Sequence, residues 1–305
     1  MLLDPRGDTP GVVWRAVDFN SSAGSARDGG RMTMPTISTS DDVEIFYKDW
    51  GSGQPIVFSH GWPLTADDWD AQMMFFLHKN YRVIAHDRRG HGRSEQTGNG
   101  NDIQHWVADL ASLTEQLDLH DAVHVGHSTG GAEVASYVAR HQERVAKAVL
   151  VSSPTPSMLQ TDNNPGGQPQ EWFDAVQAGV LGNRSEFFRA VPEGPFYGFN
   201  RPGVEPSEAI VANWWRQGMS GSAHAHYETV FSWLQDYTED LRSISVLVLV
   251  MHGDDDQIVP FTSAVPRAVD LLQNGALKTY GGYPHGMPTT HADVLNPDLL
   301  AFIAS

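Results

Sequence analysis

A serine between two glycines is the residue of this chain whose type and surroundings best suit it for chemistry. Ser128 is the centre of a Gly-x-Ser-x-Gly sequence at 126–130, which follows a short apolar run and precedes a helix-forming segment at 132–140. In a tight turn from strand to helix, such a serine presents its hydroxyl above the edge of a sheet. The glycines let strand and helix approach closely, while the serine takes a strained backbone conformation. The pattern predicts that Ser128 is a nucleophile.

A serine nucleophile needs a base, and the base needs a carboxylate that orients it. With this kind of turn, the acid precedes the histidine in the chain. His285 lies in a turn-rich loop after the last predicted strand, where it would accept the serine proton and return it to the leaving group. Three consecutive residues, Asp254, Asp255 and Asp256, follow the apolar strand predicted at 246–251. All three lie near the sheet edge at which Ser128 is expected, and their spacing does not show which of them orients His285.

An oxyanion hole requires two backbone N–H groups that point at the developing negative charge. One would be the N–H of Thr129, directly after the serine and at the positive end of the following helix. The other should come from the loop after an early strand, at 59–63. We expect Trp62 to supply it, because Pro63 has no N–H and restricts Trp62 to extended geometry.

Alternating strand and helix patterns from residue 42 onward predict the elements that carry these residues. Several strands, such as 246–250, are continuous apolar runs, which is typical of strands covered on both faces of a parallel sheet. We expect strands at 43–50, 55–60, 82–87, 122–127, 147–152, 246–251 and 277–280. We expect amphipathic helices at 68–78, 103–117, 131–141, 262–272 and 291–304.

The alternation stops between about residues 153 and 243. This segment opens with turn residues and continues with helical stretches rich in tryptophan and phenylalanine. Because it stands between two strands, we expect an all-helical cap over the sheet edge at which open α/β folds bind ligands. The sequence therefore predicts an α/β core formed by 35–152 and 244–305, with a cap formed by 153–243.

Residues 1–34 differ from the rest, with scattered charge, glycine and serine and no sustained periodicity. We expect a flexible N-terminal extension, with Met32 or Met34 as an alternative start. It lacks the long apolar centre of a signal peptide. No run of the chain approaches eighteen apolar residues, so we expect no membrane span and a cytoplasmic location.

Composition excludes several classes of protein. The formal net charge of −17 argues against nucleic-acid binding, which needs a basic surface. The absence of cysteine excludes disulfides, a cysteine nucleophile and thiolate metal sites. The 305 residues are enough for one large domain with an insertion.

Other polar clusters favour structural roles over metal or phosphate binding. His124 and His127 are three positions apart on a predicted strand, without the His-Glu-x-x-His pattern of a metal-binding helix. The aspartate run at 254–256 lacks the alternating ligand spacing of a calcium loop. We interpret the arginine-rich turn at 88–93 as a brace for neighbouring carboxylates. We expect neither a metal nor a cofactor.

Beyond these local patterns, the chain resembles the cofactor-free haloperoxidase and aryl esterase group of the α/β-hydrolases. The resemblance covers roughly residues 35–304. The core segments that carry it are 60–64, 86–94, 126–131, 252–260 and 284–286, and the cap segments are 196–203 and 215–219.

The resemblance implies an α/β-hydrolase fold and a role for each site residue. It selects Asp256 as the acid and His285 as the base, and it places the oxyanion donors at Trp62 and Thr129. Members of the group hydrolyse esters, and some act on lactones or cyclic amides. Several also carry out perhydrolysis, in which hydrogen peroxide and a short carboxylic acid give a peracid that oxidises halide. The Trp62-Pro63 pair resembles the members known as non-haem chloroperoxidases.

We therefore expect a serine hydrolase that cleaves small or aryl carboxylic esters through an acyl-Ser128 intermediate, with perhydrolase side activity. The alternatives are a lactonase or γ-lactamase on cyclic substrates, a physiological non-haem chloroperoxidase, and a non-enzymatic receptor with the hydrolase fold. The intact set of catalytic residues argues against the receptor. Assembly into a homo-oligomer is a further expectation from the resemblance.

Overall fold

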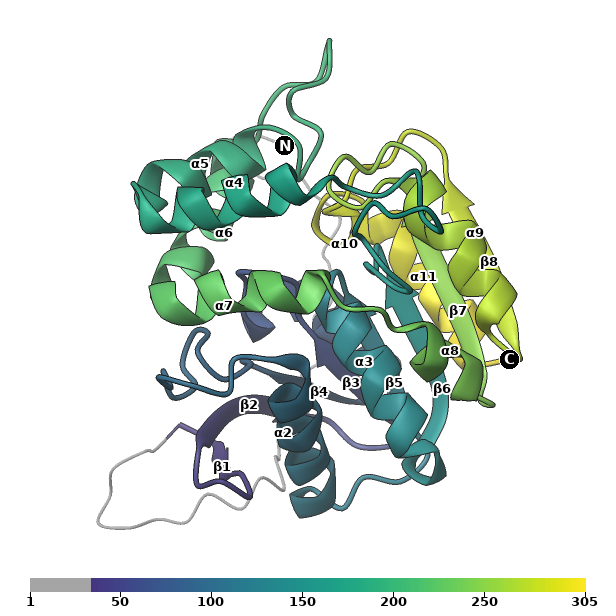
Figure 1. Ribbon diagram of the computed structural model, residues 1–305. Helices are drawn as coiled ribbons and strands as arrows, with labels where there is room; N and C mark the ends of the chain where they lie inside the picture. Colours follow the sequence, from purple (N-terminus) through teal and green to yellow (C-terminus); the bar gives the residue numbers. More distant parts are fainter. Residues whose placement is uncertain (1–33) are drawn as a thin grey trace, which may run out of the picture.

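An eight-stranded sheet forms the centre of the molecule (Figure 1), in a computed structural model that describes residues 34–305. The extension predicted at 1–34 lies outside the described residues, except for Met34. The strands are β1 (Thr36–Ser38), β2 (Glu44–Trp50), β3 (Pro55–Ser59), β4 (Arg82–His86), β5 (Ala122–His127), β6 (Val145–Val151), β7 (Leu247–Gly253) and β8 (Gly275–Tyr280). All seven predicted strands are present. The prediction missed β1, because it has three residues and a single buried side chain, Ile37.

The strand order is β1-β2-β4-β3-β5-β6-β7-β8. Strands β3 to β8 are parallel, whereas β2 is antiparallel to both of its neighbours. The register pairs Ser59, the last residue of β3, with Gly126 near the end of β5. The loop after β3 therefore begins beside the turn that carries Ser128. The fold is of the α/β class with a mostly parallel sheet, as predicted.

Helices cover both faces of this sheet. None of the helices between residues 34 and 305 combines the length and the apolar character that a membrane span requires. The helical elements of the core are η1 (Ala66–Trp69), α1 (Asp70–Leu77), α2 (Ile103–Gln116), α3 (Thr129–Arg140), η2 (Gln142–Arg144), α8 (Thr238–Ser243), α9 (Phe261–Leu271), α10 (Met287–Thr290) and α11 (Ala292–Ile303).

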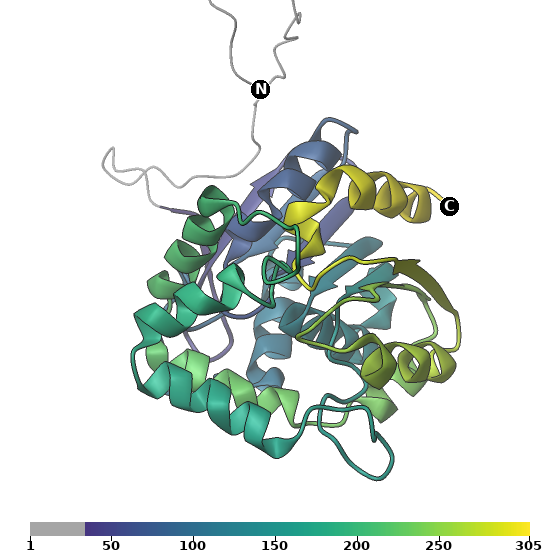
Figure 2. The same cartoon turned by 90° about the horizontal axis from the view of Figure 1, so that it is seen from above.

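Two apolar layers hold these helices to the sheet. Along β7, Val248 and Val250 pack into the layer of α2, α3, α8 and α9, whereas Leu249 and Met251 pack into the layer of α1 and α11. Figure 2 shows α11 beside α1 on one side of the sheet. This alternation is the period-two pattern of a strand buried on both faces, and it explains why the strand is continuously apolar.

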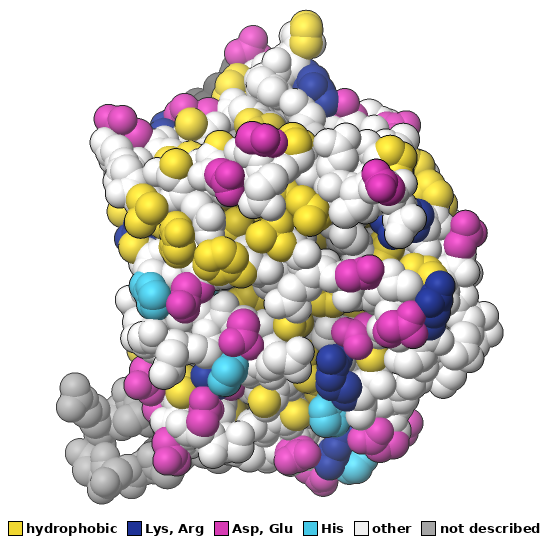
Figure 3. Space-filling view, in the orientation of Figure 1, with side chains coloured by type: hydrophobic (Ala, Val, Ile, Leu, Met, Phe, Trp, Pro, Cys, Tyr) yellow, Lys and Arg dark blue, Asp and Glu magenta, His cyan; other side chains and the backbone are white. Residues whose placement is uncertain are grey.

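Four further helices form a cap over the carboxyl edge of the sheet (Figure 1). They are α4 (Gln170–Leu181), α5 (Arg184–Glu193), α6 (Glu208–Ser220) and α7 (Ala223–Trp233). Their aromatic side chains form a third apolar cluster with Trp62 and Leu64 of the core. Figure 3 shows hydrophobic side chains gathered over these helices, with acidic side chains scattered over the visible face. Helix α8 follows α7 in the chain but packs against α3 and α9.

A fully buried ion pair links three segments around the carboxyl edge. Arg88, after β4, donates from Nε to Glu133 Oε2 of α3 at 2.9 Å, and from Nη2 to the carbonyl of His60, after β3, at 2.8 Å. His86 Nε2 lies 3.0 Å from Glu133 Oε1. Burial by itself would raise the pKa of Glu133, but the charges of Arg88 and His86 hold it at about 2. The carboxylate is therefore ionised, and both of its oxygens are bound.

The other two arginines of this turn also bind carboxylates. Arg89 donates from Nε to Asp109 of α2 at 2.7 Å, and Arg93 donates from Nε to Asp87 at 2.8 Å. The bracing role predicted for the arginine-rich turn is confirmed.

A buried carboxyl, Asp68 of η1, faces α10, the short helix that follows the loop of His285. Among residues 34–305 its side chain has one hydrogen bond, accepted from Thr289 Oγ1 at 3.2 Å. Burial raises the pKa of Asp68 to about 7; the Thr289 hydrogen bond opposes the increase, and the charges of Asp70 and Asp67 add to it. The folded chain therefore holds a proton on Asp68 that the unfolded chain releases near pH 4.

We expect Arg88→Met to destabilise the fold strongly. The change leaves the buried Glu133 carboxylate without its main partner, which costs about 3–5 kcal/mol in comparable pairs. The free energy of unfolding is measured by urea denaturation. The control is Arg242→Met, which breaks the exposed Arg242–Glu239 pair and should cost no more than about 1 kcal/mol. Equal losses in the two variants would contradict the structural role of the buried pair.

We expect Asp68→Asn to stabilise the fold more at pH 8 than at pH 5. Over this range the unfolded carboxyl is already ionised, whereas the folded carboxyl must lose its proton from a buried position. The wild-type free energy of unfolding therefore falls as the pH rises, and asparagine removes that dependence. The gain at pH 8 should exceed the gain at pH 5 by on the order of 2 kcal/mol, measured by urea unfolding. Asp118→Asn, at a side chain that is 88% exposed, is the control and should show no such difference.

Candidate active site

Ser128 occupies a tight turn between β5 and α3. Its backbone angles, φ 53° and ψ −123°, lie in a region that residues other than glycine rarely populate, so the backbone is strained. A Cβ atom on Gly126 would collide with the carbonyl of Gly130, and a Cβ atom on Gly130 would collide with the backbone of Ser59. The two glycines therefore permit the close approach that holds Ser128 at the carboxyl edge of the sheet.

His285 and Asp256 form a hydrogen-bonded pair on the loops after β8 and β7. His285 Nδ1 and Asp256 Oδ2 are 2.7 Å apart, and both side chains are buried. The other two aspartates of the run bind elsewhere. Asp254 accepts a hydrogen bond from the backbone of the loop after β8, and Asp255 forms an ion pair with Arg201. Of the three candidates, Asp256 is the one that contacts His285.

The surroundings of Asp256 keep its carboxyl ionised. The backbone N–H groups of Ile258 and Val259 donate to Oδ1 at 2.9 and 2.8 Å, and His252 Nε2 lies 3.3 Å from Oδ2. Burial by itself would raise the pKa of Asp256, but His285 and His252 hold it well below its usual range. An ionised Asp256 fixes the imidazole proton of His285 on Nδ1, which leaves Nε2 available as a base.

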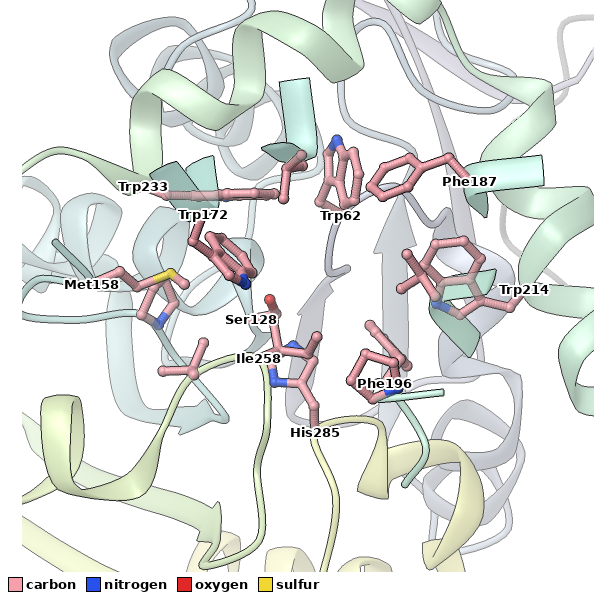
Figure 4. A pocket seen from close by; sticks show the side chains of 15 residues that line it. Trp62, Ser128, Met158, Trp172, Phe187, Phe196, Trp214, Trp233, Ile258 and His285 are labelled. Atoms are coloured by element: carbon pink, nitrogen blue, oxygen red, sulfur yellow. The ribbon is translucent and has the colours of Figure 1, made fainter. Parts of the chain in front are cut away.

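Ser128 and His285 border the same cavity without a hydrogen bond between them (Figure 4). His285 Nε2 is buried and has no hydrogen-bond partner within residues 34–305. In sites that hold no substrate, the bond between nucleophile and base is often long and tightens when the substrate binds. The unpartnered nitrogen is therefore in the state that a base needs before substrate binding.

The loop that carries His285 is held by two contacts that the sequence did not indicate. His127 Nε2 donates to the backbone carbonyl of His285 at 3.0 Å, and the two rings lie 5.0 Å apart. Burial lowers the pKa of His127 to about 3, so its ring is neutral at physiological pH. The backbone N–H of Gly286 donates to the carbonyl of Phe196, in the cap, at 2.7 Å. The end of β5, through His127, and the cap, through Phe196, thus fix where the imidazole of His285 can lie.

The two N–H groups predicted to bind an oxyanion flank Ser128. Thr129 is the first residue of α3, so its N–H has no acceptor inside the helix. Trp62 lies in the loop after β3, and a Cβ atom built on the preceding Gly61 would be 3.2 Å from Ser128 Cβ. Neither N–H has an acceptor in the part of the chain that the structure describes. Both are therefore available to a negatively charged oxygen beside Ser128.

Helix α7 binds the side chains of both of these residues. Trp62 Nε1 donates to the carbonyl of His226 at 3.1 Å, and Trp233 Nε1 donates to Thr129 Oγ1 at 2.9 Å. The two indole rings meet edge to face, 5.2 Å apart. The sequence does not indicate these contacts, because they join residues 164 and 104 positions apart and carry no motif.

An apolar cavity of about 160 Å³ lies above Ser128, between the sheet and the cap (Figure 4). Its volume is comparable to that of cavities of about 150 Å³ that accept benzene. The hydroxyl of Ser128 and the imidazole of His285 face this space. The rest of its wall is mainly aromatic and aliphatic, and the aromatic part consists of Trp62, Trp172, Trp214, Trp233, Phe187 and Phe196. Such a site favours small acyl or aryl groups and limits the access of water.

Comparison with known proteins relates this chain to proteins with a hydrolase fold. The family described as alpha/beta hydrolase fold matches residues 54–291. A non-heme chloroperoxidase of Burkholderia pyrrocinia is 59% identical over 276 residues, which cover 88% of this chain and 99% of that protein. A bifunctional esterase/perhydrolase of Acinetobacter calcoaceticus is 55% identical over 276 residues, which cover 89% and 100%.

Solved structures agree with these sequence matches. A bromoperoxidase from Bacillus anthracis superposes with a TM-score of 0.84 at 30% identity, covering 89% of this chain and 100% of that one. The resemblance that the sequence motifs indicated is confirmed by these similarities.

Proposed function

We propose that this chain, which belongs to the α/β-hydrolase fold family, hydrolyses small or aryl carboxylic esters through an acyl-serine intermediate. The observation that carries the proposal is the buried His285–Asp256 pair, whose histidine borders the same apolar cavity as the strained Ser128. The similarity to an esterase/perhydrolase over nearly the whole described chain supports it further.

In the proposed reaction, Nε2 of His285 removes the hydroxyl proton of Ser128 as the serine oxygen attacks the ester carbonyl. The backbone N–H groups of Trp62 and Thr129 stabilise the oxyanion that forms. Asp256 stabilises the imidazolium, which then protonates the departing alcohol or phenol. Water attacks the acyl-enzyme with His285 as the base, which releases the carboxylic acid and restores the serine.

Hydrogen peroxide can replace water in the last step. Attack of the peroxide oxygen on the acyl-enzyme releases a peracid and restores the serine, so no electrons are exchanged with the protein. The peracid then oxidises halide to hypohalous acid and returns to the carboxylic acid. This route accounts for haloperoxidase names among the similar proteins without a further set of residues.

Cyclic esters fall within the same proposal. A lactone presents the same acyl carbonyl, and its alcohol stays attached to the acyl group after attack. We propose esters as the main substrate class, with lactones as members of it whose ring fits the cavity.

We expect Ser128→Ala to lower kcat/KM for p-nitrophenyl acetate by at least about a thousand-fold, because no acyl-enzyme can form. The release of p-nitrophenol is followed by absorbance, and folding is checked by urea unfolding. Ser153→Ala is the matched control. That serine is buried at the same edge, after β6, but does not border the cavity. Substantial hydrolysis by Ser128→Ala would contradict the assignment of the nucleophile.

We expect halogenation by this protein to require peroxide, halide and a short carboxylic acid together. Bromination of a dye in acetate buffer should stop when acetate is replaced by a buffer without a carboxylic acid, because no peracid can form. It should stop equally in Ser128→Ala. Bromination that persists without a carboxylic acid would rule out the peracid route and leave ester hydrolysis untouched.

A further inference from the structure

The cavity above Ser128 contains one buried hydrogen-bond donor that the proposed reaction does not use. Of the four tryptophans in its wall, Trp62 and Trp233 donate to protein oxygens, and Trp172 is half-buried. Trp214, in the middle of α6, is 1% exposed, and its indole N–H has no acceptor among residues 34–305. A buried donor without an acceptor destabilises the fold unless a bound group satisfies it.

The indole of Trp214 has little freedom to turn toward another acceptor. Phe188 packs edge to face against it, with centroids 5.7 Å apart and planes at 90°, and Phe196 packs against it at 5.4 Å and 69°. Phe196 also contacts the ring of His285, at 5.0 Å between centroids. One turn later on α6, Gly218 fits so closely that an added Cβ atom would lie within 3.1 Å of Phe188 and Pro63. The direction of the N–H is therefore fixed by packing.

An unpartnered indole is not by itself a binding site. Trp69 and Trp106 also have buried N–H groups without an acceptor, but they lie in the apolar layers on the two faces of the sheet and do not border the cavity. Trp214 differs because it lines the cavity that holds Ser128. In Figure 4 it stands on the wall opposite Met158 and Trp172.

We infer that the indole N–H of Trp214 is a subsite for an oxygen acceptor of the substrate. The inference rests on the proposed ester hydrolysis and narrows its substrate class to esters with an ether or carbonyl oxygen a few bonds from the reacting carbonyl. In an otherwise apolar wall, this donor selects the oxygen-bearing chain over an alkyl chain of the same shape. The alkyl chain leaves the donor unsatisfied in the complex, and such a mismatch is a strong source of discrimination.

Trp214→Phe tests the subsite, because phenylalanine keeps an aromatic ring and lacks the N–H. Two substrate pairs differ by one oxygen in place of a methylene group. Methoxyacetate and butanoate esters of p-nitrophenol probe the acyl side, whereas 2-methoxyethyl and butyl acetate probe the alcohol side. The readout is kcat/KM for the oxygen-bearing ester divided by kcat/KM for its alkyl counterpart. Differences in the amount of active enzyme cancel from this ratio. We expect the ratio to fall roughly five- to ten-fold in one pair.

Trp106→Phe is the matched control, since it removes an unpartnered buried indole N–H away from the cavity. Both of its ratios should equal those of the wild type. Unchanged ratios for Trp214→Phe in both pairs would overturn the subsite and leave ester hydrolysis standing. Absence of hydrolysis of all four esters by the wild type would overturn both.

A second measurement separates hydrogen bonding from packing. In the ¹H–¹⁵N spectrum, the indole resonance of Trp214 is assigned by its loss in Trp214→Phe. The probe is the acid or alcohol released from the pair whose ratio changes: methoxyacetate against butanoate, or 2-methoxyethanol against butanol. We expect the oxygen-bearing compound to shift this resonance downfield and its alkyl counterpart to leave it in place. A changed ratio without that shift would mean that the ring acts through packing alone, which would also overturn the subsite.

Discussion

The buried contact between Arg88 and Glu133 is the constraint on which the geometry of the site depends. The guanidinium of Arg88 binds the carboxylate of Glu133 in α3, the helix that begins directly after Ser128. It also binds the carbonyl of His60, which precedes the loop of Trp62. The same side chain thus fixes the two segments that supply the N–H groups beside Ser128. Because the pair is fully buried, solvent does not screen it, and either partner alone would be an uncompensated charge. The strained turn at Ser128 persists in this setting because its neighbours leave it no room to relax.

An apolar cavity above a buried ionic pair suits the chemistry of acyl transfer. Asp256 is the charged group that contacts His285, and backbone N–H groups also bind its carboxylate. Interactions with a developing oxyanion are stronger in such a dry site than in water. The aromatic wall also limits water around the acyl-enzyme, so a second nucleophile that enters the cavity can compete for it. The same packing that limits water around Ser128 therefore bears on which molecule ends the reaction.

Features carried by consecutive residues could be predicted from the sequence, and features that join distant residues could not. The seven longer strands and the glycine-bounded turn at Ser128 each leave a local pattern. His285 could be placed because the loop after a parallel strand must lie at the active edge. The choice of Asp256 among three neighbours needed the family resemblance, since all three share that edge. Nothing local indicates that His127 holds the carbonyl of His285, because the contact spans 158 positions and its two segments meet only after the sheet has formed.

Helix α7 differs from the other cap helices because it forms hydrogen bonds with the side chains of both oxyanion residues. It accepts one from Trp62, and its Trp233 donates one to Thr129. The lining residues of α4 and α5, such as Trp172 and Phe187, reach the site through apolar contact, and within residues 34–305 their helices make no hydrogen bond to the oxyanion residues. Side chains on α4 and α5 can therefore diversify while the catalytic geometry is retained. Exchange of the whole cap would replace the groups that support both oxyanion residues at once. The cap is thus not one interchangeable module. Chimeras designed to alter substrate range should therefore exchange α4 and α5 and keep both α7 and the Phe196 segment, which binds the loop of His285.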